Sequence, residues 1–178
     1  MRRIAPRYPR ERGFTLPETL VMLAVFALLL GMSITYTIGW LGRAESRGAI
    51  YTMQTLFQRA RMEAVARNRA CRFTVDTATR QARIYDLVDV ANTADDILVS
   101  DTTLSSKVSF ARPDSGSAVT LASISGTTYG ATFGSDGAVS AGVGMVALLG
   151  GDGYFRVNLY GAGGASIERW NGTAWVTP

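Results

Sequence analysis

The feature that most constrains the fold of this chain is a long stretch without charge. No Asp, Glu, Lys or Arg occurs between Glu18 and Arg43, an interval of 24 positions. A helix of that length reaches about 36 Å, enough to cross a hydrocarbon core of roughly 30 Å. Its centre, Leu20–Leu30, is apolar on every helical face, which is typical of a lipid-facing helix and not of an amphipathic one. We therefore predict a transmembrane helix over residues 14–42.

Positive charge gathers on the N-terminal side of this stretch. Residues 1–13 hold five Arg and one Glu, whereas the rest of the 178-residue chain has equal numbers of basic and acidic side chains. The positive-inside rule then places the N-terminus in the cytoplasm and the bulk of the chain outside. A cleaved secretory signal peptide is the alternative, but its apolar core would span only about 7–15 residues. Glu18 also argues against it, because an unpaired carboxylate in the bilayer costs about 2.5–3.5 kcal/mol.

The composition excludes most common enzyme chemistry. The chain has no His and a single Cys, Cys71, so Ser-His-Asp and Cys-His catalysis, His-containing metal sites, CxxC redox chemistry and an internal disulfide are all excluded. A carboxylate-based hydrolase needs no His, but spacing singles out no pair of Asp residues. We predict a non-enzymatic protein without a cofactor or metal, and a buried structural thiol at Cys71.

Residues 43–69 have the period of an amphipathic helix. Apolar side chains recur every three or four positions, at Ile50, Met53, Phe57, Ala60 and Ala64. Leu56 widens this apolar stripe. Arg59, Glu63 and Arg67 lie four apart on a neighbouring stripe, which favours ion pairs along the helix. Glycines weaken the middle of the combined helix and predict a loosened or kinked stretch there, at Gly31, Gly39, Gly42 and Gly48.

Residues 70–178 have the pattern of an antiparallel β domain. The segments 71–76 and 82–88 predict a hairpin, and further strands are expected at 97–100, 107–110, 118–124, 143–149, 154–160 and 166–170. Residues 126–178 contain 13 of the 19 glycines, which indicates tight turns. The predicted fold is α+β: a long N-terminal helix, with a membrane half and an amphipathic half, packed on a C-terminal antiparallel β domain.

The residues Gly13-Phe14-Thr15-Leu16-Pro17-Glu18, followed by the apolar run, resemble the class III leader of type IV pilins and type II secretion pseudopilins. The resemblance implies that a prepilin peptidase removes the basic leader, residues 1–13, by cutting between Gly13 and Phe14, and methylates the new N-terminal Phe14. Pro17 departs from the aliphatic residue usual at its position. Proline is tolerated in the first turn of a helix, because the N–H that it lacks has no partner there.

A second resemblance narrows the family. The stretch Leu56–Arg69, which runs into a strand at Cys71–Val75, is similar to the helix end of the GspH/FimT group of minor pseudopilins and minor pilins. The segments Phe133–Gly137 and Arg156–Gly161 resemble the two closing segments of that group. This pilin-like family implies a protein of the bacterial inner membrane that is assembled into a filament, with a periplasmic domain at 70–178.

Glu18 is the predicted assembly residue. In filaments of this family the equivalent carboxylate is thought to pair with the N-terminal amine of a neighbouring subunit, which here is the amine of Phe14 after cleavage. That pairing would offset the desolvation cost of Glu18 and set the axial register between subunits. Two alternatives stay open: Glu18 neutralises the amine of its own chain, or it lies at the membrane interface near a helix N-terminus.

Three further features have more than one interpretation. Seven Arg lie between Arg43 and Arg72, and we favour lipid-headgroup and intersubunit contacts over DNA, because the distal β domain is net acidic. Five Asp lie in the interval Asp86–Asp101, where carboxylates in a solvated loop are favoured over a calcium site. Trp170 and Trp175 either anchor a partner or, as we favour, close the β core against Phe155 and Tyr160.

The sequence thus predicts a minor pilin or pseudopilin, at or near the tip of a type II secretion pseudopilus or type IV pilus, that supports assembly and protein secretion. The implied partners are other pilin or pseudopilin subunits, prepilin peptidase, the inner-membrane assembly platform and membrane lipid. The alternatives are a minor pilin for DNA uptake and a membrane-anchored periplasmic binding module that does not polymerise. The sequence leaves the apparatus, the cargo or surface ligand, and the strand order open.

Overall fold

The computed structural model describes residues 15–90 and 93–178, without the side chains of residues 33–39. The chain divides into two compact units, one ending at Ile38 and the other comprising Gly39–Pro178.

The helix α1 spans Leu16–Arg67. Its helical backbone continues through Gly31, Gly42 and Gly48, and the boundary between the two units falls within the glycine-containing stretch. The helix ends at Arg67 because Asn68 adopts a positive φ of 50°. Asn tolerates this left-handed conformation, and the Arg69 N–H then bonds the Ala64 carbonyl oxygen at 3.1 Å, which satisfies a terminal carbonyl of the helix.

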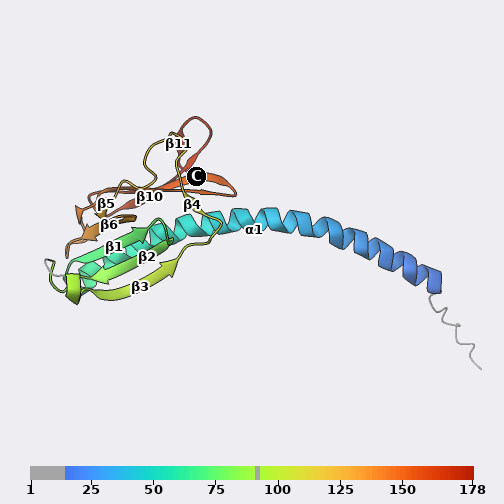
Figure 1. The fold of residues 1–178 in the computed structure, drawn as a ribbon, viewed down its shortest axis with the longest axis horizontal. Coiled ribbons are helices and arrows are strands. Elements are labelled where there is room, and N and C mark those ends of the chain that lie inside the picture. Colours follow the sequence, from blue (N-terminus) through green and yellow to red (C-terminus); the bar gives the residue numbers. More distant parts are fainter. Residues whose placement is uncertain (1–14, 91–92) are drawn as a thin grey trace, which may run out of the picture. The chain divides into compact units, whose positions relative to one another are not determined.

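The second unit contains two antiparallel sheets. The first sheet has the order β3-β2-β1-β6-β5, whose strands are labelled in Figure 1. The strand β7 also pairs with β6. Its strands are β1 Cys71–Asp76, β2 Gln81–Asp86, β3 Ile97–Thr103, β5 Ala122–Ser125, β6 Thr128–Phe133 and β7 Val139–Ala141. A short 3-10 helix, η1, covers Thr93–Asp95 before β3.

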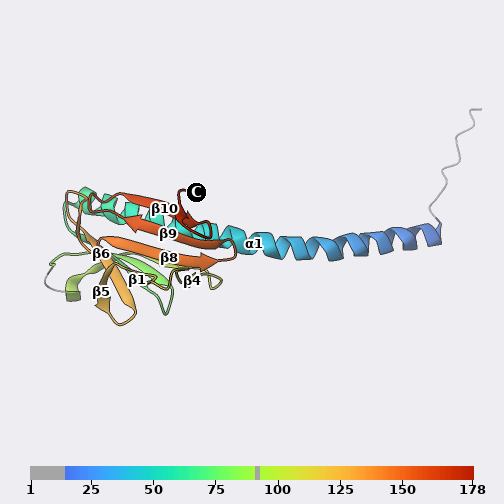
Figure 2. The same ribbon diagram turned by 90° about the horizontal axis from the view of Figure 1, so that it is seen from above.

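The second sheet has the order β11-β10-β9-β8-β4, and its long strands β8, β9 and β10 run side by side (Figure 2). Its strands are β4 Ser109–Phe110, β8 Gly144–Gly150, β9 Gly153–Leu159, β10 Ala165–Trp170 and β11 Trp175–Val176. The bridge between Val119 and Val146 ties the segment before β5 to β8. The described residues therefore confirm the predicted α+β class, and the β domain is built from two sheets.

One hydrophobic core joins α1 to both sheets. The predicted stripe of α1 is buried in full, and the ring of Phe57 lies 4.6 Å from that of Phe73 on β1, centroid to centroid. On the second sheet, Val157 and Ile167 belong to the same core. The Gln54 side chain also donates to the Ala165 carbonyl oxygen on β10 at 3.1 Å. The amphipathic half of the helix thus supplies the apolar cover that the sheets need.

The sequence missed β6, a central strand of the first sheet, and placed β5 too early in the chain. Gly130 lies in the middle of β6, and glycine is depleted in strands. The structure shows why glycine is required: an added Cβ at Gly130 would lie 2.5 Å from the Phe73 carbonyl oxygen of β1 and as close to the Ile124 side chain of β5. The closeness of neighbouring strands therefore overrides the local preference.

Candidate assembly surfaces

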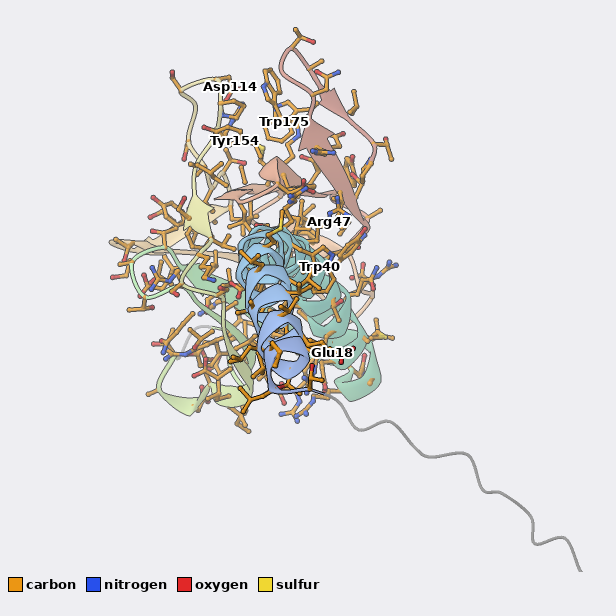
Figure 3. The ribbon with its side chains drawn as sticks, turned by 90° about the vertical axis from the view of Figure 1, so that its right-hand side faces the viewer. Glu18, Trp40, Arg47, Asp114, Tyr154 and Trp175 are labelled. Carbon is orange, nitrogen blue, oxygen red and sulfur yellow. The ribbon has the colours of Figure 1, made fainter. Side chains whose placement is uncertain are left out.

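Glu18 lies in the first turn of α1 (Figure 3). Its backbone N–H donates to the Thr15 carbonyl oxygen at 3.0 Å, and its side chain is exposed. Within residues 15–90 and 93–178, no ion pair forms at Glu18. A carboxylate at a helix N-terminus is favoured by about 0.3–1 kcal/mol. Gly13 and Phe14 lie outside the described residues, so the cleavage site and the pairing of Glu18 stay predictions.

The described residues of the first unit expose their apolar side chains. Residues 16–32 are all exposed, and Phe26 and Leu28 keep 65% and 70% of their surface. By contrast, Phe57 and Ile50, which lie on the apolar stripe of α1 in the second unit, have exposed fractions of only 0% and 1%. Of the helices in the part of the chain that the structure describes, none is long and apolar enough to count as a membrane span.

A charged contact fixes α1 to the turn between β8 and β9. Arg47, labelled in Figure 3, places its Nη2 2.7 Å from Oδ2 of Asp152, whose side chain is only 12% exposed. Nη2 of Arg169 on β10 lies 3.6 Å from Oδ1 of the same Asp152, and the Arg169 guanidinium lies 5.7 Å from the centre of the Phe155 ring. These groups line a cavity of about 260 Å³ with Ile50 in its wall. Arg47 and Arg169 thus share one carboxylate and hold helix, turn and sheet together.

A second charged cluster closes the end of α1. Glu63 accepts from Arg67 at 2.9 Å, which confirms the predicted pairing along the helix. Arg67 also donates to Asp86 at the end of β2, at 3.0 Å, and Arg69 lies 3.6 Å from the same carboxylate oxygen. Hydrogen bonds to Glu63 and Asp86 raise the pKa of Arg67 above its usual value. The cluster fixes the β1–β2 hairpin against the helix.

Cys71 lies beside this cluster. It is fully buried at the start of β1, opposite Asp86 in the register, and forms no disulfide. Burial, followed by the negative charge of Asp86, raises the pKa of the Cys71 thiol from its ordinary 9.0 to about 11. The prediction of a buried structural thiol is confirmed, because a thiol held neutral in an apolar site is a poor nucleophile.

Of the Asp residues in the interval Asp86–Asp101, Asp89 is exposed in the loop after β2, as expected, but the others do not lie in a solvated loop. Asp86 is fully buried, and the Asp96 side chain is 10% exposed with Oδ2 3.5 Å from Nη1 of Arg72. Asp101 accepts from Nε of Arg83 at 3.1 Å. In residues 15–90 and 93–178, no group of three side chains is arranged to hold a metal ion. The register of the sheet brings arginines to these carboxylates, which the spacing of the Asp residues alone could not show.

The arginines between Arg43 and Arg72 are also used within the chain. We expected them to face lipid headgroups and other subunits. Within the described residues, ion pairs with side chains of the same molecule form at Arg47, Arg59, Arg67, Arg69 and Arg72. This pairing lowers the positive charge that the helix can present to lipid, to another subunit or to DNA phosphates.

Trp170 and Trp175 do not pack as expected. Their rings contact each other edge to face, with centroids 5.4 Å apart, and the Arg156 guanidinium lies 4.5 Å from the centre of the Trp175 ring. Tyr160 is exposed and bonds the Ser166 hydroxyl at 2.9 Å. The expected packing of the tryptophans against the β core at Tyr160 is therefore wrong. The short hairpin of β10 and β11 instead forms its own aromatic cluster, labelled at Trp175 in Figure 3.

The two closing segments singled out in the sequence meet at the end of α1. The Val139 N–H donates to the Gly161 carbonyl oxygen at 2.8 Å. Gly137 has a φ of 79°, and a Cβ there would lie 3.0 Å from both the Arg61 Nε and the Val65 side chain. A Cβ at Gly163 would lie 2.1 Å from the Gly137 carbonyl oxygen. These glycines are needed because two turns and a helix approach each other closely.

Sequence reasoning missed the contacts made by Asp152 and the burial of Asp86. The residues Gly150-Gly151-Asp152-Gly153 indicate a turn, but Asp152 meets Arg47 across 105 positions of sequence. The burial of Asp86 could have been suspected from one feature only. Asp86 follows Ala82 and Ile84 at alternate positions of β2, and these positions face the core. A partner so distant in sequence can be found only when the strand order is known.

A long helix packed on antiparallel sheets, with its apolar stripe inside the core, defines a pilin-like α+β protein. The family model of the type II transport protein GspH matches residues 49–163, which include the end of α1 and both closing segments. The chain belongs to the GspH family and is a type II secretion pseudopilin, a structural class that assembles with other pseudopilin subunits and is not enzymatic. No curated protein sequence matches the chain. No solved structure matches it either.

Proposed function

We propose that this protein is a minor pseudopilin that is processed between Gly13 and Phe14, anchored in the inner membrane by residues 14–42, and extracted from it into a secretion pseudopilus. The observation that carries the proposal is the family match over residues 49–163 together with the basic leader that precedes an apolar helix. Phe14 becomes the methylated N-terminus of the mature chain.

The exposed apolar side chains of residues 16–32 support the anchoring step. Such a surface needs either lipid or other helices around it. Extraction from the membrane is feasible because neighbouring apolar helices in a filament replace the lipid and retain most of the apolar contacts. The N-terminus is cytoplasmic before cleavage, and the β domain is periplasmic.

Glu18 is proposed as the residue that sets the register between subunits. It is exposed in the first turn of α1, and no ion pair forms at it in the described part of the chain. A carboxylate of this kind is available to the freed amine of Phe14 in a neighbouring subunit. The position of the protein at or near the tip, and a role in initiating assembly and secretion, are proposed from its kinship with minor pseudopilins.

The test is the intact mass and N-terminal sequence of the protein recovered from membranes in which its prepilin peptidase is active. We expect a mature chain that begins at N-methylated Phe14. Gly13→Val should block cleavage, whereas Gly31→Ala is the matched control, because an added Cβ at Gly31 has no atom within 4 Å. A wild-type chain that retains Met1, or one that begins beyond Gly42, would refute the proposal.

Assembly is tested separately through Glu18→Gln, which keeps the shape of the side chain and removes its charge. We expect normal processing but reduced crosslinking to other pseudopilins and reduced secretion. Glu11→Gln is the control, because Glu11 lies in the leader and is absent from the mature subunit. Equal crosslinking in Glu18→Gln and Glu11→Gln would refute the role of Glu18 and leave the processing result intact.

A further inference from the structure

A polar groove of about 430 Å³ lies on the outer face of the first sheet. Alternate residues of β1 are fully buried in the core, which directs Arg72, Thr74 and Asp76 to the opposite face. The register places Tyr85 of β2 opposite Arg72, and Thr128 of β6 opposite Asp76. The groove is therefore built on adjacent, hydrogen-bonded strands and not on loops alone.

Gly130 and Ile124 shape one wall of this groove. Gly130 of β6 stands opposite Thr74 and has no side chain, and the Ile124 side chain of β5 occupies the space above it, 2.5 Å from where a Cβ would lie. Ile124 still exposes 45% of its surface. The wall thus offers an apolar contact beside the polar floor.

Asp96 at the opposite side of the groove has an incomplete set of partners. Its side chain is nine-tenths buried, and its Oδ2 lies 3.5 Å from Nη1 of Arg72, which is itself 18% exposed. Its Oδ1 is buried and has no hydrogen-bond partner among the described residues. Burial raises the pKa of Asp96 above its ordinary value. Among the described residues, the Asp96 carboxylate is paired only with Arg72, and it lines the groove as a hydrogen-bond acceptor.

The charges of the groove balance. Arg72 and Arg83 are offset by Asp96 and Asp76. Arg83 is further paired with Asp101, at 3.1 Å. Hydrogen bonds from Thr127, Ala78 and Thr79 hold the pKa of Asp76 below its ordinary value, so it stays ionised. A groove without excess positive charge does not select phosphates or nucleic acid.

We propose that this groove is a binding site for a neutral saccharide. Hydroxyl groups of a sugar both donate and accept, which suits a floor that presents guanidinium donors, the Asp96 acceptor and the Thr128 hydroxyl. Tyr85 and Ile124 provide flat and apolar surface for the C–H face of the ring. The volume accommodates about one or two sugar rings. An extended peptide would instead add to a free sheet edge through its backbone, and this groove lies on a sheet face.

The experiment uses the full chain in a detergent without a sugar headgroup. Glucose, galactose, N-acetylglucosamine and the disaccharides maltose, lactose and chitobiose are titrated and followed by saturation-transfer NMR. We expect saturation transfer to at least one of these sugars. Asp96→Asn and Tyr85→Ala should each weaken its binding at least about tenfold. Tyr160→Ala is the matched control, since Tyr160 is exposed on the other sheet and lies outside the groove.

Thr128→Val keeps the shape of its side chain and removes one hydroxyl, so it tests the site if Asp96→Asn fails to fold. We expect Thr128→Val to weaken sugar binding severalfold at unchanged stability. The proposal is overturned if no sugar binds, if the three groove variants bind as well as Tyr160→Ala, or if inorganic phosphate binds as tightly as the sugars. The proposal is also overturned if ordered water, and no sugar, is the hydrogen-bond partner of Asp96. None of these outcomes affects the processing test at Gly13.

Discussion

The turn between β8 and β9 docks on α1 through Ser46, and Gly150→Ala is expected to disrupt this contact. The Ser46 hydroxyl donates to the Gly42 carbonyl oxygen at 2.8 Å and accepts from the Gly151 N–H at 2.7 Å. An added Cβ at Gly150 would lie 2.0 Å from Oγ and 2.5 Å from Cβ of Ser46. Ser46 is only 3% exposed, so its side chain has little room to turn away.

The magnitude follows from two terms. Overpacking a buried contact costs about 1–3 kcal/mol, and loss of the hydrogen bond from Gly151 to Ser46 costs about 1 kcal/mol more. Gly150→Ala should therefore lower the free energy of unfolding by roughly 2–4 kcal/mol. In a domain of this size the corresponding fall in Tm is roughly 5–15 °C.

The assay is urea and thermal unfolding of the full chain, followed by tryptophan fluorescence. Gly164→Ala is the matched control, because no atom lies within 4 Å of an added Cβ there and its φ is not in the left-handed region. Ser46→Gly combined with Gly150→Ala removes both close contacts, and the double-mutant cycle should show a favourable coupling of about 1–2 kcal/mol. A Gly150→Ala protein within about 0.5 kcal/mol of wild type would refute the reasoning.

Three further outcomes are expected in the same assay. Gly48→Ala should raise the free energy of unfolding by about 0.5–1 kcal/mol, because Gly48 is exposed within α1 and an added Cβ meets no atom within 4 Å; an unchanged urea midpoint would contradict this. Asp86→Asn should cost roughly 1.5–3 kcal/mol by weakening the bonds to Arg67, and a cost equal to that of an exposed Asp→Asn change would contradict the buried ion pair. The thiol of Cys71 has a pKa raised from 9.0 to about 11 in the fold, so its contribution to stability is complete below pH 9 and is lost as the pH rises toward 11. Wild type should thus lose more stability than Cys71→Ala over this interval, and parallel pH profiles of the two proteins would count against the buried thiol.

The parts that could be predicted from sequence are those set by short-range periodicity. The apolar stripe on α1 was identified residue by residue because a helix repeats every 3.6 positions, and all its members are buried. The hairpin of β1 and β2 followed in the same way from alternation and a short connection. The candidate residue Glu18 was found because a carboxylate at the start of an apolar run is costly without a partner.

What only the tertiary structure decided depends on segments that are distant in sequence. β6 is a strand despite Gly130, because the close approach of β1 and β5 leaves no room for a side chain. Asp152 bonds Arg47, which lies 105 positions away in the sequence. The register of β1, β2 and β6 brings together the residues that line the outer groove. Local propensity contributes less than about 1 kcal/mol per residue, whereas burial and pairing between distant segments contribute several, so these contacts decide the structure wherever the two disagree.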